Sequence, residues 1–234
     1  GQEPSAVTLK LIRLKPLFMD KAVGFLLSLF LQILFRACFL LQVKGKVNLP
    51  GKGPYIIYAN HSSYLDGFII AASLPLKLVF NTYFLGFKGY ILNPIVKPVV
   101  KLARLVPLDT TSDLVEVMQA CSYLLKHSKI ICFFPEGHRS ASGEVMQFKK
   151  GIGILTKELD VALAPVYIEG AFRAWPRYVW FPRPAKIKVT FGKKLYPRDL
   201  LPKTLDKGDV YELFAESLRQ ELIKIKDLPA KPPV

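Results

Sequence analysis

The sequence predicts an α/β domain, with a mixed, largely parallel sheet flanked by helices and an N-terminal membrane-associating helical segment. Two observations predict this fold. Short apolar runs typical of buried strands alternate with helical stretches after Lys44. An uncharged apolar run also lies near the start of the chain, over residues 22–35.

Composition excludes several classes of protein. The chain has 234 residues, of which 51% are hydrophobic, so it can bury enough surface to offset its ordering entropy and is not disordered. Its three cysteines are odd in number and do not form a disulfide framework. We also find no closely spaced Cys and His residues and therefore predict no metal site. The length fits one domain, or one domain with an appendage.

The formal net charge is +15, and the basic excess is concentrated in the first half. Residues 21–108 contain ten Lys or Arg and a single acid, Asp66, whereas residues 109–234 contain twenty bases and fifteen acids. Such a bias attracts either nucleic acid or anionic lipid headgroups. The high hydrophobicity, and the lack of a spaced aromatic and basic platform for bases, favour lipid. We expect a phospholipid membrane as partner and no nucleic acid.

The apolar run determines how that membrane would be contacted. Residues 22–35 are too few to span a bilayer, which takes roughly 20 apolar residues. A run extended through Arg36 to Val43 would be long enough to span the bilayer. It would place the Arg36 guanidinium inside the bilayer unless that group snorkels to the interface. We expect a monotopic membrane-dipping helix or helical hairpin over residues 17–43, after a linker or amphipathic lead-in over 1–16. A single spanning helix and a buried core helix are the alternatives.

The predicted elements follow in order along the domain, which we place at residues 44–226 before a Pro-rich tail at 227–234. Apolar runs rich in β-branched and aromatic residues predict strands at 54–60, 77–83, 130–136, 162–169 and 186–192. Helical periodicity predicts helices at 65–74, 92–103, 113–127, 152–159 and 209–226.

Sites in open α/β sheets form where strands end, and the first predicted strand ends in a polar cluster that includes Asn60, His61, Ser63 and Asp66. A carboxylate five residues after a histidine can fold back and accept from one imidazole nitrogen, which leaves the other nitrogen free as a base. The alternative is that Asp66 only caps the helix that starts near Leu65, and that His61 is a buried histidine.

A second cluster, residues 133–140, follows another predicted strand and contains Glu136, Gly137, Arg139 and Ser140. Gly137 would let the backbone approach a ligand, and Arg139 could clamp phosphate oxygens in bidentate fashion. The alternative is a turn with a local Glu–Arg surface pair.

Two weaker signals follow. Lys149 and Lys150 stand at the predicted start of a helix, where backbone N–H groups and ammonium groups favour an anion; the alternative is a solvated pair of lysines. Pro165 lies inside a strand-like run, which predicts a bulge or an edge strand.

The reaction type is narrowed by motifs that the sequence lacks. It contains no G-x-S-x-G elbow, H-E-x-x-H, Walker A loop or full dinucleotide fingerprint. A histidine base without a Ser or Cys nucleophile predicts direct attack by a substrate hydroxyl on an activated carbonyl, as in acyl transfer from a thioester. Such a reaction requires no metal and no covalent intermediate.

The ordered clusters Asn-His-x4-Asp, Phe-Pro-Glu-Gly-x-Arg-Ser, Phe-Lys-x-Gly and Ala-Pro-Val, over about residues 43–192, resemble the glycerolipid acyltransferase family. The resemblance implies that His61 is the general base and that Asp66 orients it. It also implies that Glu136, Gly137 and Arg139 help bind the glycerophosphate part of the acceptor, while Pro165 shapes the acyl-donor side. Acyl-CoA or acyl carrier protein would bring the acyl group as a co-substrate, with no further cofactor.

One departure concerns the acceptor. Many family members have an Arg shortly after the segment that matches residues 105–109, where this chain has Thr110 and Thr111. The pattern is similar to the branch that reacylates lysophosphatidylethanolamine, often fused to an acyl-carrier-protein synthetase. The resemblance therefore implies a lysophospholipid acceptor, either lysophosphatidylethanolamine-like or lysophosphatidic acid, at the cytoplasmic face of the inner membrane. A catalytically silent membrane- or polyanion-binding module and an acyl-thioester hydrolase are the alternative functions.

Overall fold

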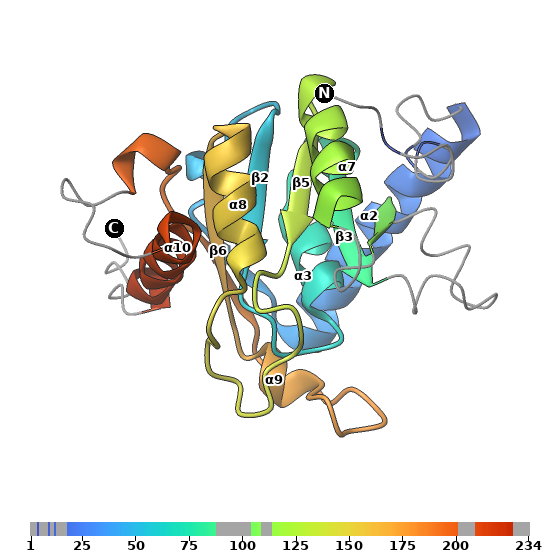
Figure 1. Ribbon diagram of the computed structural model, residues 1–234. Helices are drawn as coiled ribbons and strands as arrows, with labels where there is room; N and C mark the ends of the chain where they lie inside the picture. The colour runs from blue at the N-terminus through green and yellow to red at the C-terminus, as the bar shows by residue number, and fades with distance from the viewer. Residues whose placement is uncertain are drawn as a thin grey trace.

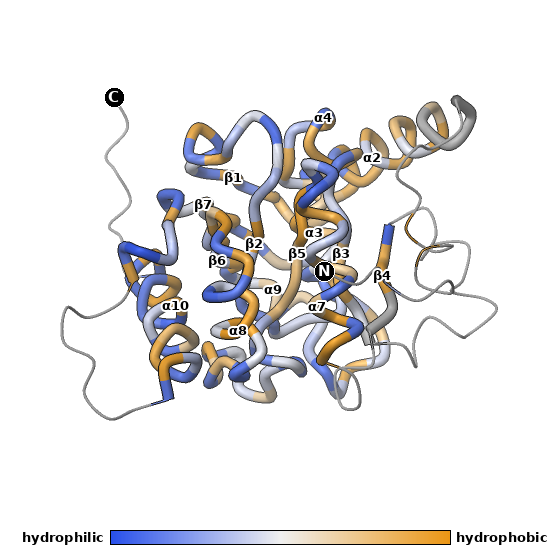
Figure 2. The backbone as a smooth tube through the Cα atoms, turned by 45° about the horizontal axis from the view of Figure 1, so that its top comes forward, coloured by the Kyte–Doolittle hydropathy of each residue, from blue (hydrophilic) through white to orange (hydrophobic). Residues whose placement is uncertain are grey.

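The computed structural model describes residues 4, 9, 12, 18–87, 104–108, 114–200 and 209–226. Its centre is a seven-stranded sheet in the order β1-β7-β6-β2-β5-β3-β4 (Figures 1 and 2). The strands are β1 Gln42–Lys44, β2 Tyr55–Ala59, β3 Thr82–Phe87, β4 Leu105–Leu108, β5 Ile130–Phe133, β6 Leu163–Glu169 and β7 Lys188–Phe191. All neighbours pair in parallel except β6 and β7, which are antiparallel. The predicted mixed, largely parallel sheet is confirmed.

Helices cover both faces of this sheet. They are α2 Phe18–Phe39, α3 Asp66–Ser73, α4 Leu76–Val79, α7 Leu114–Lys126, α8 Lys150–Leu159, α9 Ala171–Ala174 and α10 Val210–Lys226, with short 3₁₀ turns η1 Lys46–Asn48 and η2 Pro197–Asp199. Successive side chains of a strand point to opposite faces. Tyr55 and Ile57 of β2 therefore pack in a core shared with α2 and α3. Ile56 and Tyr58 pack in a second core, shared with α7, α8 and α10.

The N-terminal apolar run forms one helix, α2, of 22 residues. Its window Ala22–Phe39 is long and apolar enough to cross a membrane by length and composition, and only 17% of that window is buried. In Figures 1 and 2 the amino-terminal end of α2 extends away from the rest of the molecule. Its carboxyl-terminal end is anchored, since Phe35 and Phe39 are buried in the core with α3. Most of the expected lead-in over residues 1–16 lies outside the described residues.

The predicted strand at 77–83 was wrong over residues 77–81. Pro75 precedes the short helix α4, and the strand β3 begins only at Thr82. A short apolar run such as Leu76–Val79 does not distinguish a helix from a strand by periodicity, and here the helix forms. The predicted helix at 92–103 and the tail at 227–234 lie outside the described residues.

Two strands, β1 and β4, were not predicted. They form the two edges of the described sheet and have only three and four residues. β4 contains Pro107, which is tolerated at an edge. The predicted boundary between residues 43 and 44 falls inside β1. Because β1 pairs with β7, the apolar segment continues directly into the sheet.

Candidate active site

The imidazole of His61 and the carboxylate of Asp66 meet where β2 ends. The Nδ1 atom of His61 lies 2.8 Å from Oδ2 of Asp66. The Asp66 side chain is completely buried, whereas the His61 side chain keeps 22% of its surface exposed. A buried carboxylate that accepts from Nδ1–H selects the tautomer whose Nε2 carries no proton. The pair therefore has the geometry of a general base and the group that orients it.

Asp66 is more than a helix cap. Its Oδ2 also accepts the backbone N–H groups of Ser62 and Ser63, at 2.7 and 2.8 Å. Both serines precede α3, and the cap residue of α3 is Leu65, which makes no side-chain cap hydrogen bond. Asp66 therefore folds the 61–66 turn around its own carboxylate and fixes His61 within that turn.

Glu136, at the end of β5, holds the backbone of His61 from the other side. Its Oε1 accepts the His61 N–H at 2.7 Å, and its Oε2 accepts the Met146 N–H at 3.1 Å. Burial raises the pKa of the Glu136 carboxyl to about 7, against the lowering effect of these two N–H groups. The structure thus places Glu136 behind the histidine, as a bridge between the β2 turn and the 140–149 segment.

Two further contacts hold His61, one on its imidazole ring and one on its backbone carbonyl. The ring of Phe134 stacks on the His61 ring with centroids 4.2 Å apart and planes 15° from parallel. The His61 carbonyl accepts the N–H of Ser140 at 2.8 Å, and the Ser140 hydroxyl accepts the N–H of Gly143 at 3.0 Å. Ser140 is buried, so the structure shows it anchoring the loop.

Asn60 and Ser63 are buried and bound to backbone from β6 or the segment after it. The Asn60 amide donates to the carbonyl of Ile168 at 2.9 Å and accepts its N–H at 2.8 Å. The Ser63 hydroxyl donates to the carbonyl of Trp175 at 2.9 Å. These hydrogen bonds tie the 61–66 turn to the end of β6 and to the segment after α9.

Arg139 and Lys149 stand in the same loop cluster. The guanidinium of Arg139 lies over the ring of Tyr64, 3.5 Å from its centroid. Lys149 immediately precedes α8, and its stem faces Gly137, where an added Cβ would lie 3.3 Å from the Lys149 Cγ. The φ of Gly137 is +76°, a conformation that favours glycine. The structure thus groups two cations around a turn that only glycine adopts easily.

Pro165 occupies an interior strand, β6, rather than the predicted bulge or edge. It pairs with Tyr58 of β2. On its other side β7 ends at Phe191, and the carbonyl of Pro165 accepts the N–H of Gly192 at 2.9 Å. A proline is tolerated there because it lies opposite Gly192, just beyond the end of the β7 strand.

Sequence reasoning missed two groups around this site. Phe134 was included in the 133–140 cluster but was given no role, because its stacking on His61 joins residues 73 positions apart in the chain. The segment after α9 was not singled out at all, although Trp175 and Arg177 contact the 61–66 turn. Its acid-free, aromatic-rich sequence was the available signal.

The sheet and the His61–Asp66 pair define a candidate active site at the end of the central strand, and comparison with known proteins shows the family. The family model described as "Acyltransferase" matches residues 40–169, more than half of the chain. The chain belongs to this acyltransferase family.

The chain is also similar to individual proteins. It is 30% identical over 156 residues to "1-acyl-sn-glycerol-3-phosphate acyltransferase LPAT1, chloroplastic" of Arabidopsis thaliana, covering 65% of this chain and 42% of the relative. It is 27% identical to the 1-acyl-sn-glycerol-3-phosphate acyltransferase of Pseudomonas aeruginosa, covering 70% and 62%. The chain therefore spans about half the length of these relatives. The crystal structure of the acyltransferase PlsC from Thermotoga maritima has the same fold, with a TM-score of 0.69 at 22% identity, covering 91% of this chain and 83% of that one.

Proposed function

We propose that this protein transfers a fatty acyl group from an acyl thioester, acyl-CoA or acyl carrier protein, to the free hydroxyl of a lysophospholipid. The observation that carries the proposal is the His61–Asp66 pair, 2.8 Å apart at the end of β2 in a chain of the acyltransferase family. A general base in this position needs a substrate hydroxyl to deprotonate, and a lysophospholipid has one.

The proposed mechanism has His61 as its base. The Nε2 atom takes the proton of the acceptor hydroxyl while the oxygen attacks the thioester carbonyl carbon. Asp66 stabilises the imidazolium that forms and keeps the ring in its tautomer. Collapse of the tetrahedral intermediate breaks the carbon–sulfur bond, and the imidazolium returns its proton to the departing thiolate. An ester and a free thiol are the products.

The neighbours of the dyad support this role by holding His61 still. Glu136 binds its backbone N–H, Ser140 its carbonyl and Phe134 its ring. Catalytic groups that are already in position lose little entropy when the substrate binds. The dyad therefore needs no rearrangement to accept a proton.

We assign the anionic part of the acceptor to the cations beside the dyad. Arg139 and Lys149 lie on segments that flank Gly137, and a guanidinium and an ammonium group both suit phosphate oxygens. The relatives named above are 1-acyl-sn-glycerol-3-phosphate acyltransferases. The Thr110–Thr111 sequence nevertheless favours a lysophosphatidylethanolamine-like acceptor over lysophosphatidic acid. That segment lies outside the described residues.

We place the reaction at the cytoplasmic membrane surface. The exposed apolar face of α2 supports membrane association, with Leu26 and Ile33 each more than half exposed. Arg36 in the last turn of the helix favours a monotopic insertion, in which the guanidinium stays at the headgroups.

The test is an assay with radiolabelled acyl-CoA or acyl carrier protein and a panel of lysophospholipids in mixed micelles. We expect new diacyl lipid with at least one acceptor. His61→Ala and Asp66→Asn should each lower the rate by at least about 100-fold, the usual contribution of a general base. His127→Ala is the matched control. His127 lies just before β5, which is parallel to β2, so it stands at the opposite end of the strands from His61 and should keep wild-type activity.

Three results would contradict the proposal. Wild-type turnover in His61→Ala would show that His61 is not the general base. Release of free fatty acid without diacyl lipid would make the protein a thioester hydrolase. Lipid binding with no consumption of any thioester would make it a catalytically silent membrane module.

A further inference from the structure

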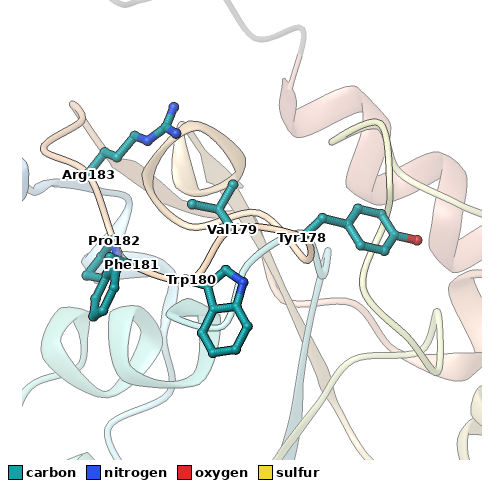
Figure 3. Close-up of a pocket in the computed structure, with 6 residues that line it drawn as sticks. All are labelled: Tyr178, Val179, Trp180, Phe181, Pro182 and Arg183. Carbon is teal, nitrogen blue, oxygen red and sulfur yellow. The ribbon is translucent and has the colours of Figure 1, made fainter.

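The segment between β6 and β7 carries an exposed aromatic loop, residues 174–183, beside the 61–66 turn. The side chains of Tyr178, Trp180 and Phe181 are 73%, 88% and 77% exposed. Figure 3 shows Trp180 and Phe181 extending from the loop next to each other. The loop forms an open depression of about 380 Å³ lined by Tyr178, Val179, Trp180, Phe181, Pro182 and Arg183. Exposed aromatic residues gathered in this way mark an interaction surface.

Hydrogen bonds fix the shape of this aromatic loop. The N–H of Arg183 donates to the carbonyl of Ala174 at 2.7 Å and closes the loop at its base. Within it, the indole N–H of Trp175 donates to the carbonyl of Val179 at 2.8 Å. The loop therefore presents its aromatic tip in a preformed conformation, which lowers the entropy cost of binding.

The charge around the aromatic loop selects an anionic partner. Residues 170–198 contain eight Lys or Arg and no Asp or Glu. Arg177 and Arg183 flank the aromatic tip and are exposed. Trp and Tyr rings favour the headgroup level of a bilayer, and adjacent bases are attracted to anionic lipids.

The segment that follows the aromatic loop is hydrogen-bonded to the end of the apolar helix α2. The N–H of Ile187, four residues after the loop, donates to the carbonyl of Phe39 at the end of α2, at 3.0 Å. The next bond of this seam joins the N–H of Gln42 to the carbonyl of Ile187 at 2.9 Å. Leu40, between these contacts, is itself exposed. The carboxyl-terminal end of α2 is thus hydrogen-bonded to the segment that follows the aromatic loop.

We infer that the aromatic loop is a second membrane contact, which inserts Tyr178, Trp180 and Phe181 into the headgroup region of an anionic bilayer beside the dyad. The inference rests on the membrane side of the proposed function. Its consequence for the site is geometric. The carbonyl of Trp175 accepts from the Ser63 hydroxyl, and the carbonyl of Arg177 accepts from the Tyr64 hydroxyl, so a bilayer that holds the loop also holds the 61–66 turn at its surface.

The test uses the fluorescence of the two tryptophans of the full chain. Vesicles of phosphatidylcholine and phosphatidylglycerol carrying brominated acyl chains quench tryptophans that reach the bilayer. We expect strong quenching in the wild type and at least a twofold smaller loss in Trp180→Phe, where only the half-buried Trp175 emits. The inference is wrong if the wild-type chain binds the vesicles and Trp180 emission is unchanged.

A second measurement is vesicle binding by a Trp180→Ser, Phe181→Ser double variant. We expect its affinity for the same anionic vesicles to fall several-fold. Val47→Ser is the matched control, because Val47 is 92% exposed but lies far from the aromatic loop. It follows β1, which is antiparallel to β2 and so ends at the opposite end of the strands. Equal binding by the double variant and the control would overturn the inference.

The remaining outcome concerns an acidic protein partner. If acyl carrier protein without vesicles shifts Trp180 emission, and vesicles do not, the aromatic loop docks a protein and the inference fails. Quenching is measured without donor or acceptor, and His61→Ala should keep it. Loss of acyl transfer with intact quenching would therefore overturn only the proposed function, and intact transfer without quenching would overturn only this inference.

Discussion

The histidine of the site is held by three side chains that act on three different parts of the residue. Asp66 binds its ring nitrogen, Phe134 its ring face and Glu136 its backbone N–H. Removing one of them leaves the other two in place, so the consequences of each substitution can be separated. Glu136 is the most informative because it is buried and its pKa is raised.

At the residue scale we predict a pH dependence of stability that comes from Glu136. Its pKa is about 7 in the folded protein and about 4.5 in the unfolded chain, so the folded state binds the proton more tightly. This contribution to stability is fully present below about pH 4.5 and is lost as the pH rises to about 7. The free energy of unfolding of the wild type should fall by up to about 3 kcal/mol across this window relative to Glu136→Gln.

The measurement is urea unfolding in a non-ionic detergent between pH 4 and 8. Glu144→Gln is the control, since Glu144 is exposed and lies in the same loop, and it should show the same pH dependence as the wild type. A wild type and a Glu136→Gln variant whose stabilities change in parallel with pH would show that the burial of Glu136 does not affect its titration.

Sequence patterns could indicate His61 and Asp66 because the two are five residues apart and share one turn. The partner of Glu136 could not be inferred in this way, since its contact with His61 joins residues 75 positions apart. The sequence suggested a phosphate-binding turn for Glu136, and the structure shows a buried acceptor of two backbone N–H groups. The phosphate role of the neighbouring Arg139 stays a prediction.

At the element scale, length and burial decided which strands could be predicted. β2, β5 and β6 are buried on both faces and therefore are continuous apolar runs. The edge strand β1 lacks such a run, β4 is an apolar run of only four residues that contains Pro107, and the four residues of α4 carry no helical period. The antiparallel direction of β7 is set by the connection from β6, which passes through the aromatic loop instead of a long crossover helix.

The contact between α8 and α10 supplies a prediction about packing. A Cβ at Gly153 would lie 1.8 Å from the carbonyl oxygen of Tyr211, so the two helices approach closely only because residue 153 has no side chain. Gly153→Ala should therefore destabilise the protein by about 3 kcal/mol, the upper range for overpacking. Gly151→Ala, in the same helix, meets nothing within 4 Å and should stabilise by about 0.5 kcal/mol through its helix propensity.

Denaturant midpoints of the two variants test this pair. Because both replace a glycine of α8 by alanine, their difference reports the contact with α10 alone. Equal midpoints would mean that α10 can move away from α8 at no cost.

At the scale of the whole molecule, the apolar helix is joined to the α/β domain in two ways, by its own contact with the end of α3 and through β1, the strand that follows it. Gln32 donates to the carbonyl of Leu74, and β1 pairs with β7. The same helix leaves Leu26, Phe30 and Ile33 exposed. The front of the chain therefore has two roles, with one face of α2 completing the core and the other available to a bilayer.

These two roles predict different results for two truncations. Deleting residues 1–30 removes most of the exposed apolar face but keeps Phe35 and Phe39, so the protein should fold and bind vesicles weakly. Deleting residues 1–40 also removes these two buried phenylalanines and the carbonyl that accepts from Ile187. Each buried phenylalanine contributes about 3–5 kcal/mol, and their joint loss is comparable to the whole stability of a domain. The longer deletion should therefore unfold the protein, as circular dichroism and vesicle cosedimentation would show, whereas a stable fold without residues 1–40 would mean that α2 is only an anchor.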